Sequence, residues 1–208
     1  MENNIKLYNM DCMEYMVSCK DNEFDLAIVD PPYGINVNMN MGVRKGEKRK
    51  HKQKQWDKET PDSDYFKELF RVSKNQIIWG GNYFELPLIK YWIIWDKLIT
   101  GKVDFAEGEM AWSSLNTNLK IFKHSIQNNY INEPRIHPTQ KPKKLYEWLL
   151  KNYAETGNKI LDTHLGSGSS AIAAYNYKFD FVGLEIDKEY FDAAVNRLNN
   201  HKAQLTMF

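Results

Sequence analysis

Short apolar runs recur along the chain, separated by polar segments and turn residues. These runs span four to seven residues and are rich in β-branched and aromatic side chains. Gly, Asp or Pro bounds most of them, which is typical of buried strands in a largely parallel sheet. Strands are expected at residues 5–8, 24–29, 76–79, 91–95, 159–162 and 179–185. Apolar residues at helical spacing predict helices at residues 63–72, 145–153, 171–177 and 188–200.

The composition agrees with one compact domain. A chain of 208 residues that is 42% hydrophobic can bury a substantial core, and no shift in composition marks a boundary within residues 1–208. No apolar stretch is long enough for a signal peptide or a membrane span, so a cytoplasmic protein is expected. Cys12 and Cys19 are seven residues apart, which suits two turns of one helix rather than a redox or zinc pair, so we expect reduced thiols.

The strand at residues 24–29 leads directly into Asp30-Pro31-Pro32-Tyr33. Asp30 can accept hydrogen bonds from an exocyclic amine. The two prolines fix the backbone and remove donors, so neighbouring carbonyls serve as further acceptors. Tyr33 offers a ring on which an extruded base can stack. This set of groups suits methylation of a weakly nucleophilic amine; the alternative is a strand that ends at an ordinary turn.

A second candidate site lies at residues 159–170, where a strand, a glycine turn and a helix follow one another. Gly166 and Gly168 allow a sharp turn and a close approach of the backbone to a ligand. Glu185 ends the next strand and is placed to accept hydrogen bonds from ribose hydroxyls. Residues 166–171 also match the dinucleotide pattern G-x-G-x-x-A, so an NAD-dependent oxidoreductase remains an alternative.

The two sites together resemble those of the amino-group DNA methyltransferases that use S-adenosylmethionine. The order of the sites is that of the subclass in which the catalytic tetrapeptide precedes the glycine loop. The resemblance covers most of the chain and includes His137-Pro138-Thr139-Gln140-Lys141-Pro142 and Asn9-Met10-Asp11-Cys12. It implies a Rossmann-like α/β methyltransferase fold, with a circularly permuted, mostly parallel sheet and helices on both faces.

The resemblance also implies S-adenosylmethionine as the cofactor and direct methyl transfer. Residues 137–142 would touch the methionine end of the cofactor, and Asp11 would lie near its adenine. The expected cofactor-binding residues are Asp11, His137, Thr139, Lys141, Asp162, His164, Gly166, Ser167, Gly168, Ser169 and Glu185. The expected catalytic residues are Asp30, Pro31, Pro32 and Tyr33.

The target base is expected to be adenine. Once flipped from the duplex, adenine would stack on Tyr33 and present its N6 amine to Asp30 and the Pro31 carbonyl. Asp at the first tetrapeptide position favours adenine in this family, but cytosine N4 offers the same amine chemistry and stays open. A non-catalytic DNA-binding module is a third alternative, from a different class.

The glycine loop departs from the family pattern. Members commonly have Asp-Pro-Phe-x-Gly-Ser-Gly, whereas Thr163 and His164 stand at the second and third positions here. An imidazole therefore replaces an aromatic contact to the methionine. No other His or Cys is near His164 in the sequence, so no metal site is expected.

A cationic run follows the tetrapeptide, within a predicted loop at residues 36–60. Residues 44–58 hold eight cations and two acids, a net charge of +6 in a chain whose total is +1. The position beside the tetrapeptide favours phosphate contacts over a merely solvated loop, so double-stranded DNA is the expected partner. The residues expected to contact DNA are Arg44, Lys45, Lys48, Arg49, Lys50, Lys52 and Lys54.

Two further segments indicate contacts with partners. Strand candidates at 109–113 and 119–124 lie in a polar segment from about residue 98 to 132, and they predict a small recognition hairpin. Gln204-Leu205-Thr206-Met207-Phe208 resembles the pentapeptide that binds the bacterial sliding clamp; a terminus packed on the enzyme is the alternative. The recognition sequence, the pairing of two chains into a homodimer and a companion restriction enzyme stay open.

Overall fold

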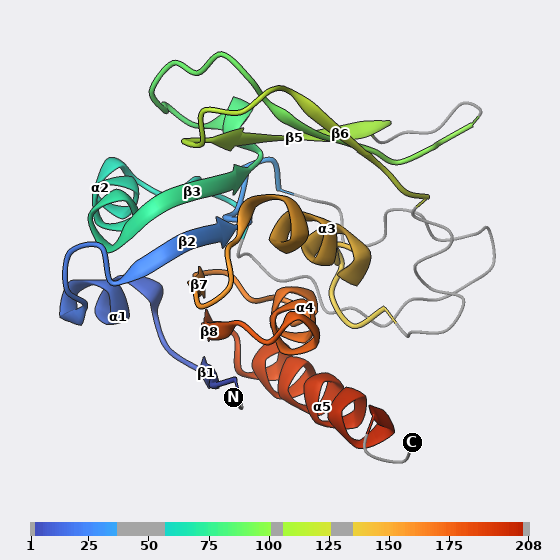
Figure 1. Ribbon diagram of the computed structural model, residues 1–208. Helices are drawn as coiled ribbons and strands as arrows, with labels where there is room; N and C mark the ends of the chain where they lie inside the picture. Colours follow the sequence, from blue (N-terminus) through green and yellow to red (C-terminus); the bar gives the residue numbers. More distant parts are fainter. Residues whose placement is uncertain (1–2, 37–56, 101–105, 126–134, 206–208) are drawn as a thin grey trace.

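The computed structural model describes residues 3–36, 57–100, 106–125 and 135–205 (Figure 1). These residues form an eight-stranded sheet in the order β1-β8-β7-β2-β3-β5-β4-β6. Its strands are β1 (Ile5–Tyr8), β2 (Phe24–Val29), β3 (Ser73–Trp79), β4 (Ile93–Asp96), β5 (Gly108–Ser113), β6 (Lys120–Lys123), β7 (Lys159–Asp162) and β8 (Asp180–Leu184). The helices are α1 (Cys12–Ser18), α2 (Ser63–Val72), α3 (Lys143–Tyr153), α4 (Ser169–Tyr177) and α5 (Lys188–Leu205), with a short 3₁₀ helix η1 (Gly81–Tyr83).

One strand of the sheet, β5, runs against the others. It pairs antiparallel with β3 and with β4, whereas the remaining pairings are parallel. The expected permuted, mostly parallel α/β sheet of the Rossmann-like type is confirmed.

The predicted recognition hairpin is wrong in its pairing. Strands form near the expected positions, as β5 and β6, but β4 lies between them and pairs with both. Ala111 and Trp112 of β5 are buried, so this strand gains more by packing inside the sheet than it would in an exposed hairpin. Residues 101–105 and 126–134 lie outside the described residues.

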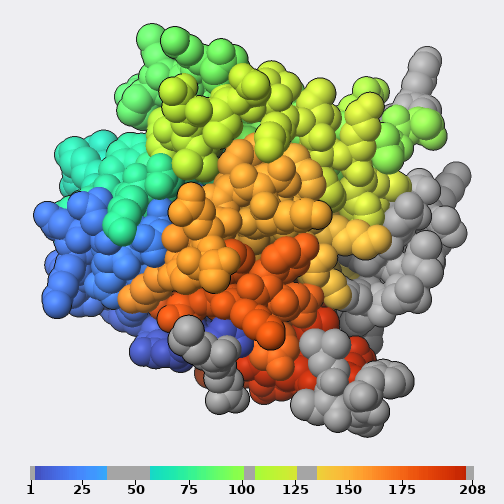
Figure 2. Space-filling model, in the orientation of Figure 1, coloured from blue at the N-terminus to red at the C-terminus, as the bar shows by residue number. Residues whose placement is uncertain are grey.

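Helices cover both faces of the sheet, as expected. α1 and α2 pack on one face, and α3, α4 and α5 pack on the other (Figure 1). Successive residues of β2 serve the two cores in turn, because side chains alternate along a strand. Leu26 and Ile28 pack on the α3 side, and Ala27 and Val29 pack on the α1 side. In the space-filling view the orange atoms of α3 and α4 occupy the middle of the face shown (Figure 2).

The predicted start of α2 is confirmed by its cap. The Asp62 carboxylate accepts hydrogen bonds from the backbone N–H groups of Asp64 and Tyr65, both at 3.0 Å. These bonds satisfy two of the donors that the first turn of a helix leaves free. The chain therefore enters the helix directly after residue 62.

Two expectations about the chain as a whole can be compared with the structure. Cys12 opens α1 and Cys19 follows its last residue, and both are free thiols. Within the described ranges, none of the helices has an apolar stretch sufficient to cross a bilayer. The single-domain and cytoplasmic assignments stay predictions.

The strand directions bring several loops to one edge of the sheet. The carboxyl ends of β1, β2, β3, β4, β7 and β8 meet there because these strands are parallel. β5 runs the opposite way, so its amino end lies at the same edge. The Gly80 N–H donates to the Met110 carbonyl and the Lys97 N–H to the Glu107 carbonyl, each at 2.9 Å. Residues from both ends of the sequence therefore converge at this edge.

Candidate active site

Two cavities adjoin one another at this edge of the sheet. The first, of about 420 Å³, is lined by all four residues of the tetrapeptide at 30–33, and we call it the tetrapeptide cavity. The second, of about 360 Å³, is lined by residues 164–167 among others, and we call it the glycine-loop cavity. Asp30, Pro32 and Thr139 line both cavities. The two sites expected from the sequence therefore share a wall.

Asp30 follows the last residue of β2 and directs its carboxylate toward a buried cation. Its Oδ2 lies 2.5 Å from Lys141 Nζ, and its Oδ1 accepts a hydrogen bond from the Tyr33 hydroxyl at 2.6 Å. Burial raises the pKa of Asp30 above its ordinary value, and the Lys141 ammonium opposes this rise. Each carboxylate oxygen has a second lone pair, so Asp30 can still accept hydrogens from a substrate amine.

Two neighbours pack against the Tyr33 ring. It stacks on Tyr83 with ring centroids 4.9 Å apart and an interplanar angle of 9°. Gly80 has φ +67°, and a Cβ at this position would lie 2.2 Å from Tyr33 Cε1. The close approach therefore requires glycine. A base that stacks on Tyr33 therefore has to displace one of these neighbours or use the part of the ring that they leave open.

Asp57 anchors the backbone of the tetrapeptide, a role that the sequence analysis missed. This buried residue accepts hydrogen bonds through Oδ1 from the backbone N–H groups of Tyr33, at 2.8 Å, and Gly34, at 3.1 Å. The Asn36 N–H also donates to the Asp57 carbonyl at 2.9 Å. The chain on either side of residues 37–56 therefore meets beside the tetrapeptide cavity. In the sequence, Asp57 is one of only two acids in the cationic run at residues 44–58, and this feature could have singled it out.

Asp162 stabilises the glycine loop by hydrogen bonds made on the side away from the glycine-loop cavity. It is buried at the end of β7, where Oδ1 accepts from the His164 N–H at 3.0 Å and Oδ2 accepts from the Ser170 hydroxyl at 2.5 Å. Burial raises the pKa of Asp162 to about 7. Its side chain braces the turn but is not among the residues that line the glycine-loop cavity.

Glu185 and Asp11 lie at the rim of the glycine-loop cavity, at the ends of β8 and β1. Glu185 accepts from the Gly166 N–H through Oε2 at 2.8 Å and from the Asp187 N–H through Oε1 at 2.9 Å. Asp11 caps α1 by accepting from the Met13 N–H at 2.7 Å. Both carboxylates are therefore fixed by backbone donors at the positions where parallel strands end.

The structure brings together most of the expected cofactor-binding residues. Those that line the glycine-loop cavity are Asp11, His137, Thr139, His164, Gly166, Ser167 and Glu185. Gly168 and Ser169 lie behind the loop with Asp162, because Gly168 opens α4 with φ +73° and the Ser169 hydroxyl donates to the Lys141 carbonyl at 2.8 Å. Lys141 lines the other cavity: the structure places its ammonium with the tetrapeptide.

His164, which stands where the family usually has an aromatic residue, is half-buried in the wall of the glycine-loop cavity. Its Nδ1 lies 2.9 Å from the Thr163 hydroxyl, which in turn lies 2.7 Å from the Tyr65 hydroxyl. Burial lowers the pKa of His164 to about 4. The ring is therefore neutral at physiological pH, and it offers an uncharged wall to the glycine-loop cavity.

Two further charged residues near the cavities were missed. Glu109, in β5, lies 3.0 Å from Lys141 Nζ through Oε2 and 2.7 Å from Lys97 Nζ through Oε1. Arg197, in α5, donates through Nη1 to the Ser167 carbonyl and to the Ser169 hydroxyl, both at 2.9 Å. A carboxylate inside an apolar strand was a signal for Glu109, whereas nothing in the pattern of α5 distinguishes Arg197 from a surface cation.

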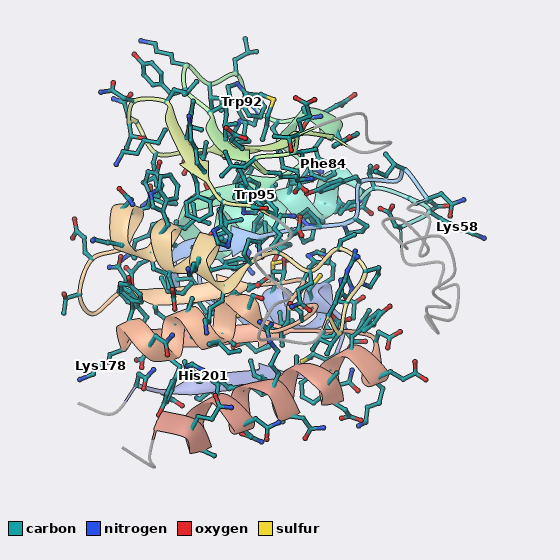
Figure 3. All side chains as sticks on the ribbon, turned by 90° about the vertical axis from the view of Figure 1, so that its right-hand side faces the viewer. Lys58, Phe84, Trp92, Trp95, Lys178 and His201 are labelled. Atoms are coloured by element: carbon teal, nitrogen blue, oxygen red, sulfur yellow. The ribbon has the colours of Figure 1, made fainter. Side chains whose placement is uncertain are left out.

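Several expected site residues cannot be placed. The expected DNA contacts at 44–54 and residues 206–208 of the clamp-like tail lie outside the described residues. Lys58, which belongs to the same cationic run, is exposed and projects from the periphery (Figure 3). Among the described residues, no group of three or more His, Cys, Asp and Glu side chains is arranged to hold a metal ion.

A family model described as DNA methylase matches residues 76–196. The chain therefore belongs to this family of S-adenosylmethionine-dependent enzymes that methylate amino groups of DNA. The expected family and cofactor are confirmed, and the oxidoreductase alternative is set aside. The matched region begins after the tetrapeptide, so the assignment of residues 30–33 depends on their geometry.

Individual proteins agree with this assignment. The Type II methyltransferase M.BglII of Bacillus subtilis is 25% identical, over 93% of this chain and 69% of that protein. The crystal structure of the M1.HpyAVI–SAM complex has a TM-score of 0.62 at 21% identity, over 93% of this chain and 99% of that chain. The PvuII DNA methyltransferase, described as cytosine-N4-specific, has a TM-score of 0.62 at 14% identity, over 98% and 93%. At these identities the two structures show the shared fold.

Proposed function

We propose that this protein methylates the N6 amine of an adenine extruded from double-stranded DNA. The tetrapeptide cavity would hold the base, and the glycine-loop cavity would hold S-adenosylmethionine. One observation carries the proposal: the two cavities meet at Asp30, Pro32 and Thr139. A group that accepts the amine hydrogens therefore stands at the junction where a methyl donor and a base would meet.

The residues of the glycine-loop cavity suit the cofactor. Glu185 is held by backbone donors at the end of β8, where ribose hydroxyls bind in this type of sheet. The neutral His164 ring offers no charge that would repel a cation. S-adenosylmethionine, when bound, supplies an electrophilic methyl group on a sulfonium centre. Residues 137–139 line the same cavity through His137 and Thr139.

The tetrapeptide would act by positioning the amine and by stabilising charge. Asp30 would accept an amine hydrogen with its unused lone pairs, and the Pro31 carbonyl would accept the other. Tyr33, which lines the tetrapeptide cavity, would offer its ring to the base for stacking. As positive charge develops on the amine nitrogen, the Asp30 carboxylate would stabilise it. These roles require no covalent intermediate with the enzyme.

The choice of adenine over cytosine depends on the resemblance of the tetrapeptide, since both bases present the same kind of amine. The fold does not discriminate, because the cytosine-N4-specific PvuII enzyme shares it. Analysis of nucleosides from methylated DNA decides between them: N6-methyladenine supports the proposal, and N4-methylcytosine overturns this part of it. The designation of M.BglII as a Type II methyltransferase supports a role in restriction–modification.

The cationic residues at 44–54 are proposed to bind phosphates. Support comes from the described residues on either side, since Asn36 and Asp57 are joined by a backbone hydrogen bond at the tetrapeptide cavity. The run therefore leaves and re-enters the fold beside the proposed base site. The sliding-clamp contact of residues 204–208 and a homodimer stay predictions.

Replacement of Asp30 tests the proposal. We expect Asp30→Ala to lower methyl transfer to DNA on the order of 1,000-fold or more, because it removes the acceptor at the reacting amine. Transfer is measured with isotopically labelled S-adenosylmethionine, and cofactor affinity is measured by calorimetry. Affinity should stay close to that of the unmodified protein, since Asp30 is one of many residues around the glycine-loop cavity.

Asp25→Ala is the matched control. Asp25 lies on the same strand but binds Lys74 at 2.7 Å and the Lys159 N–H at 2.8 Å, outside both cavities. Its replacement should leave methyl transfer unchanged. Full activity of Asp30→Ala would refute the proposed role, and loss of cofactor binding together with activity would make Asp30 structural. An unmodified protein that binds DNA and cofactor without methylation would be a non-catalytic module.

A further inference from the structure

The tetrapeptide cavity contains a buried chain of alternating charges. Lys97 contacts Glu109 at 2.7 Å, Glu109 contacts Lys141 at 3.0 Å, and Lys141 contacts Asp30 at 2.5 Å. The Lys141 side chain is only 4% exposed. The chain links β4, β5 and the segment before α3 to the residue that follows β2. Four elements far apart in the sequence therefore meet at one row of charges.

The Lys141 ammonium makes three contacts. Besides the two carboxylates, it donates to the Tyr33 hydroxyl at 3.1 Å, and Tyr33 in turn donates to Asp30 Oδ1 at 2.6 Å. The contact with Glu109 Oε2 is an ion pair without a hydrogen bond. Lys141, Asp30 and Tyr33 therefore form a closed triangle, and Glu109 holds the cation from outside it.

We infer that Lys141 and Glu109 are positioning residues of this enzyme: Glu109 places the Lys141 ammonium, which orients the Asp30 carboxylate and the Tyr33 hydroxyl for the target base. This inference rests on the proposed function, in which Asp30 receives the amine. Buried ion pairs contribute little net stability, because desolvation offsets their attraction. A row of charges at the wall shared by both cavities is therefore better suited to orienting groups than to holding the fold.

Lys141 and Glu109 act on Asp30 in opposite senses. The cation favours the ionised carboxylate, and the second carboxylate disfavours it. The other titratable groups that act on Asp30 are Tyr33, Tyr65, Tyr146 and Asp162. These groups stay the same in Lys141 and Glu109 variants, so comparison between variants cancels their effect.

The partners of Asp30 have pKa values that move away from the range of the assay. Burial would raise the pKa of Glu109, but Lys141 and Lys97 outweigh it and lower the value to about 2. Burial would lower the pKa of Lys141, but Asp30 and Glu109 outweigh it and raise the value. Asp162, with a pKa of about 7, titrates alike in all the variants, so a displacement of the acidic limb of the pH–rate profile between variants reports the ionisation of Asp30.

The experiment measures single-turnover methylation of DNA between pH 5 and 9 at saturating cofactor. In Lys141→Met the acidic limb should move to higher pH by about one to three units, because Asp30 loses its counter-ion. In Glu109→Gln it should move to lower pH, because Asp30 loses a like charge. Lys141→Arg should restore the profile in part. The inference predicts that the acidic limbs of Lys141→Met and Glu109→Gln move in opposite directions. Structural damage alone would lower the rate in both variants without moving their acidic limbs in opposite directions.

Glu23→Gln is the matched control for Glu109→Gln. Glu23 also contacts a lysine at 2.7 Å, Lys159, but it precedes β2 at the opposite end from Asp30. The pH–rate profile of Glu23→Gln should match that of the unmodified protein. Cofactor binding confirms that each variant is folded, and Glu109→Gln retains the test if Lys141→Met does not fold.

The outcomes separate this inference from the proposed function. If the unmodified protein does not methylate DNA, or if Asp30→Ala remains fully active, the proposed function fails. The other case is an inactive Asp30→Ala variant together with acidic limbs of Lys141→Met and Glu109→Gln that move in the same direction or stay in place. The positioning role of Lys141 and Glu109 then fails, while the proposed function stands.

Discussion

Asp162 should make the stability of the protein fall as the pH rises, and Asp162→Asn should remove this dependence. Burial raises the pKa of Asp162 from an ordinary value of 3.8 to about 7. Between these values the unfolded chain has lost the proton while the folded protein retains it. Folding therefore binds a proton, and stability decreases with increasing pH. The contribution is fully present below pH 3.8 and is lost as the pH rises through about 7.

The magnitude follows from the displacement of the pKa. About three pH units correspond to about 4 kcal/mol, at about 1.4 kcal/mol for each unit. Asn is nearly the same size as Asp, its carbonyl can accept the His164 N–H, and its amide can donate to the Ser170 hydroxyl. Relative to the unmodified protein, Asp162→Asn should therefore gain about 3 kcal/mol of unfolding free energy between pH 4 and pH 7.

Urea denaturation at pH 4, 5.5, 7 and 8 provides the assay, with the free energy of unfolding compared between the two proteins at each pH. Asp62→Asn is the control for the chemical change, since Asp62 is an exposed helix cap and Asn serves equally as a cap. Parallel stability curves for Asp162→Asn and the unmodified protein would refute the reasoning. They would mean that Asp162 is ionised in the fold at neutral pH.

Two other substitutions test how the site is supported. Gly80→Ala places a Cβ 2.2 Å from Tyr33 Cε1 at φ +67°, so methylation should fall on the order of 100-fold with cofactor affinity retained. Gly157→Ala, at φ +91° with no atom within 4 Å, is the control that carries backbone strain alone, about 1 kcal/mol, and should leave methylation unchanged. Arg197→Met removes donors to Ser167, so calorimetry should show cofactor affinity about tenfold weaker, with methylation restored at saturating cofactor. Unaltered affinity would mean that Arg197 does not hold the loop.

The sequence predicted most elements of the fold because their patterns are local. Alternation and β-branched residues located β1, β2, β7 and β8 within a residue or two of their observed limits. Trp79 in β3 and Trp95 in β4 are buried, with exposures of 0% and 2%. The helices α2, α3, α4 and α5 were also predicted, with α5 extending to Leu205 rather than ending near residue 200. These elements can be recognised because burial of one face leaves a periodic pattern of apolar residues, and burial of both faces leaves a continuous apolar run.

The pairing of β5 could not be predicted in the same way. Two short strands separated by six residues fit a hairpin as well as they fit separate positions in a sheet. The deciding factor is the burial of Ala111 and Trp112 between β3 and β4, which depends on the whole sheet. The local sequence pattern therefore located β5 and β6 correctly but paired them with each other instead of with β4.

The same limit applies to the site. The tetrapeptide and the glycine loop have compact motifs, so Asp30 and Gly166 could be named as candidates from the sequence, and the structure places them at adjoining cavities. Lys141 belongs to a motif whose other members line the glycine-loop cavity, and only the fold shows that its ammonium reaches the tetrapeptide instead. A motif indicates where a backbone segment lies, but a lysine side chain is long enough to serve a neighbouring cavity.

The reversed direction of β5 explains why a carboxylate from the middle of the chain takes part in the site. In a fully parallel sheet this edge would receive only residues that follow strands, as Asp30 follows β2. Because β5 enters at this edge, its second residue, Glu109, lies opposite the ends of β3 and β4. It can then bind Lys97, which follows β4, and Lys141, which approaches from the other half of the chain. One antiparallel strand in the sheet thus supplies the anion that neutralises the cation beside Asp30.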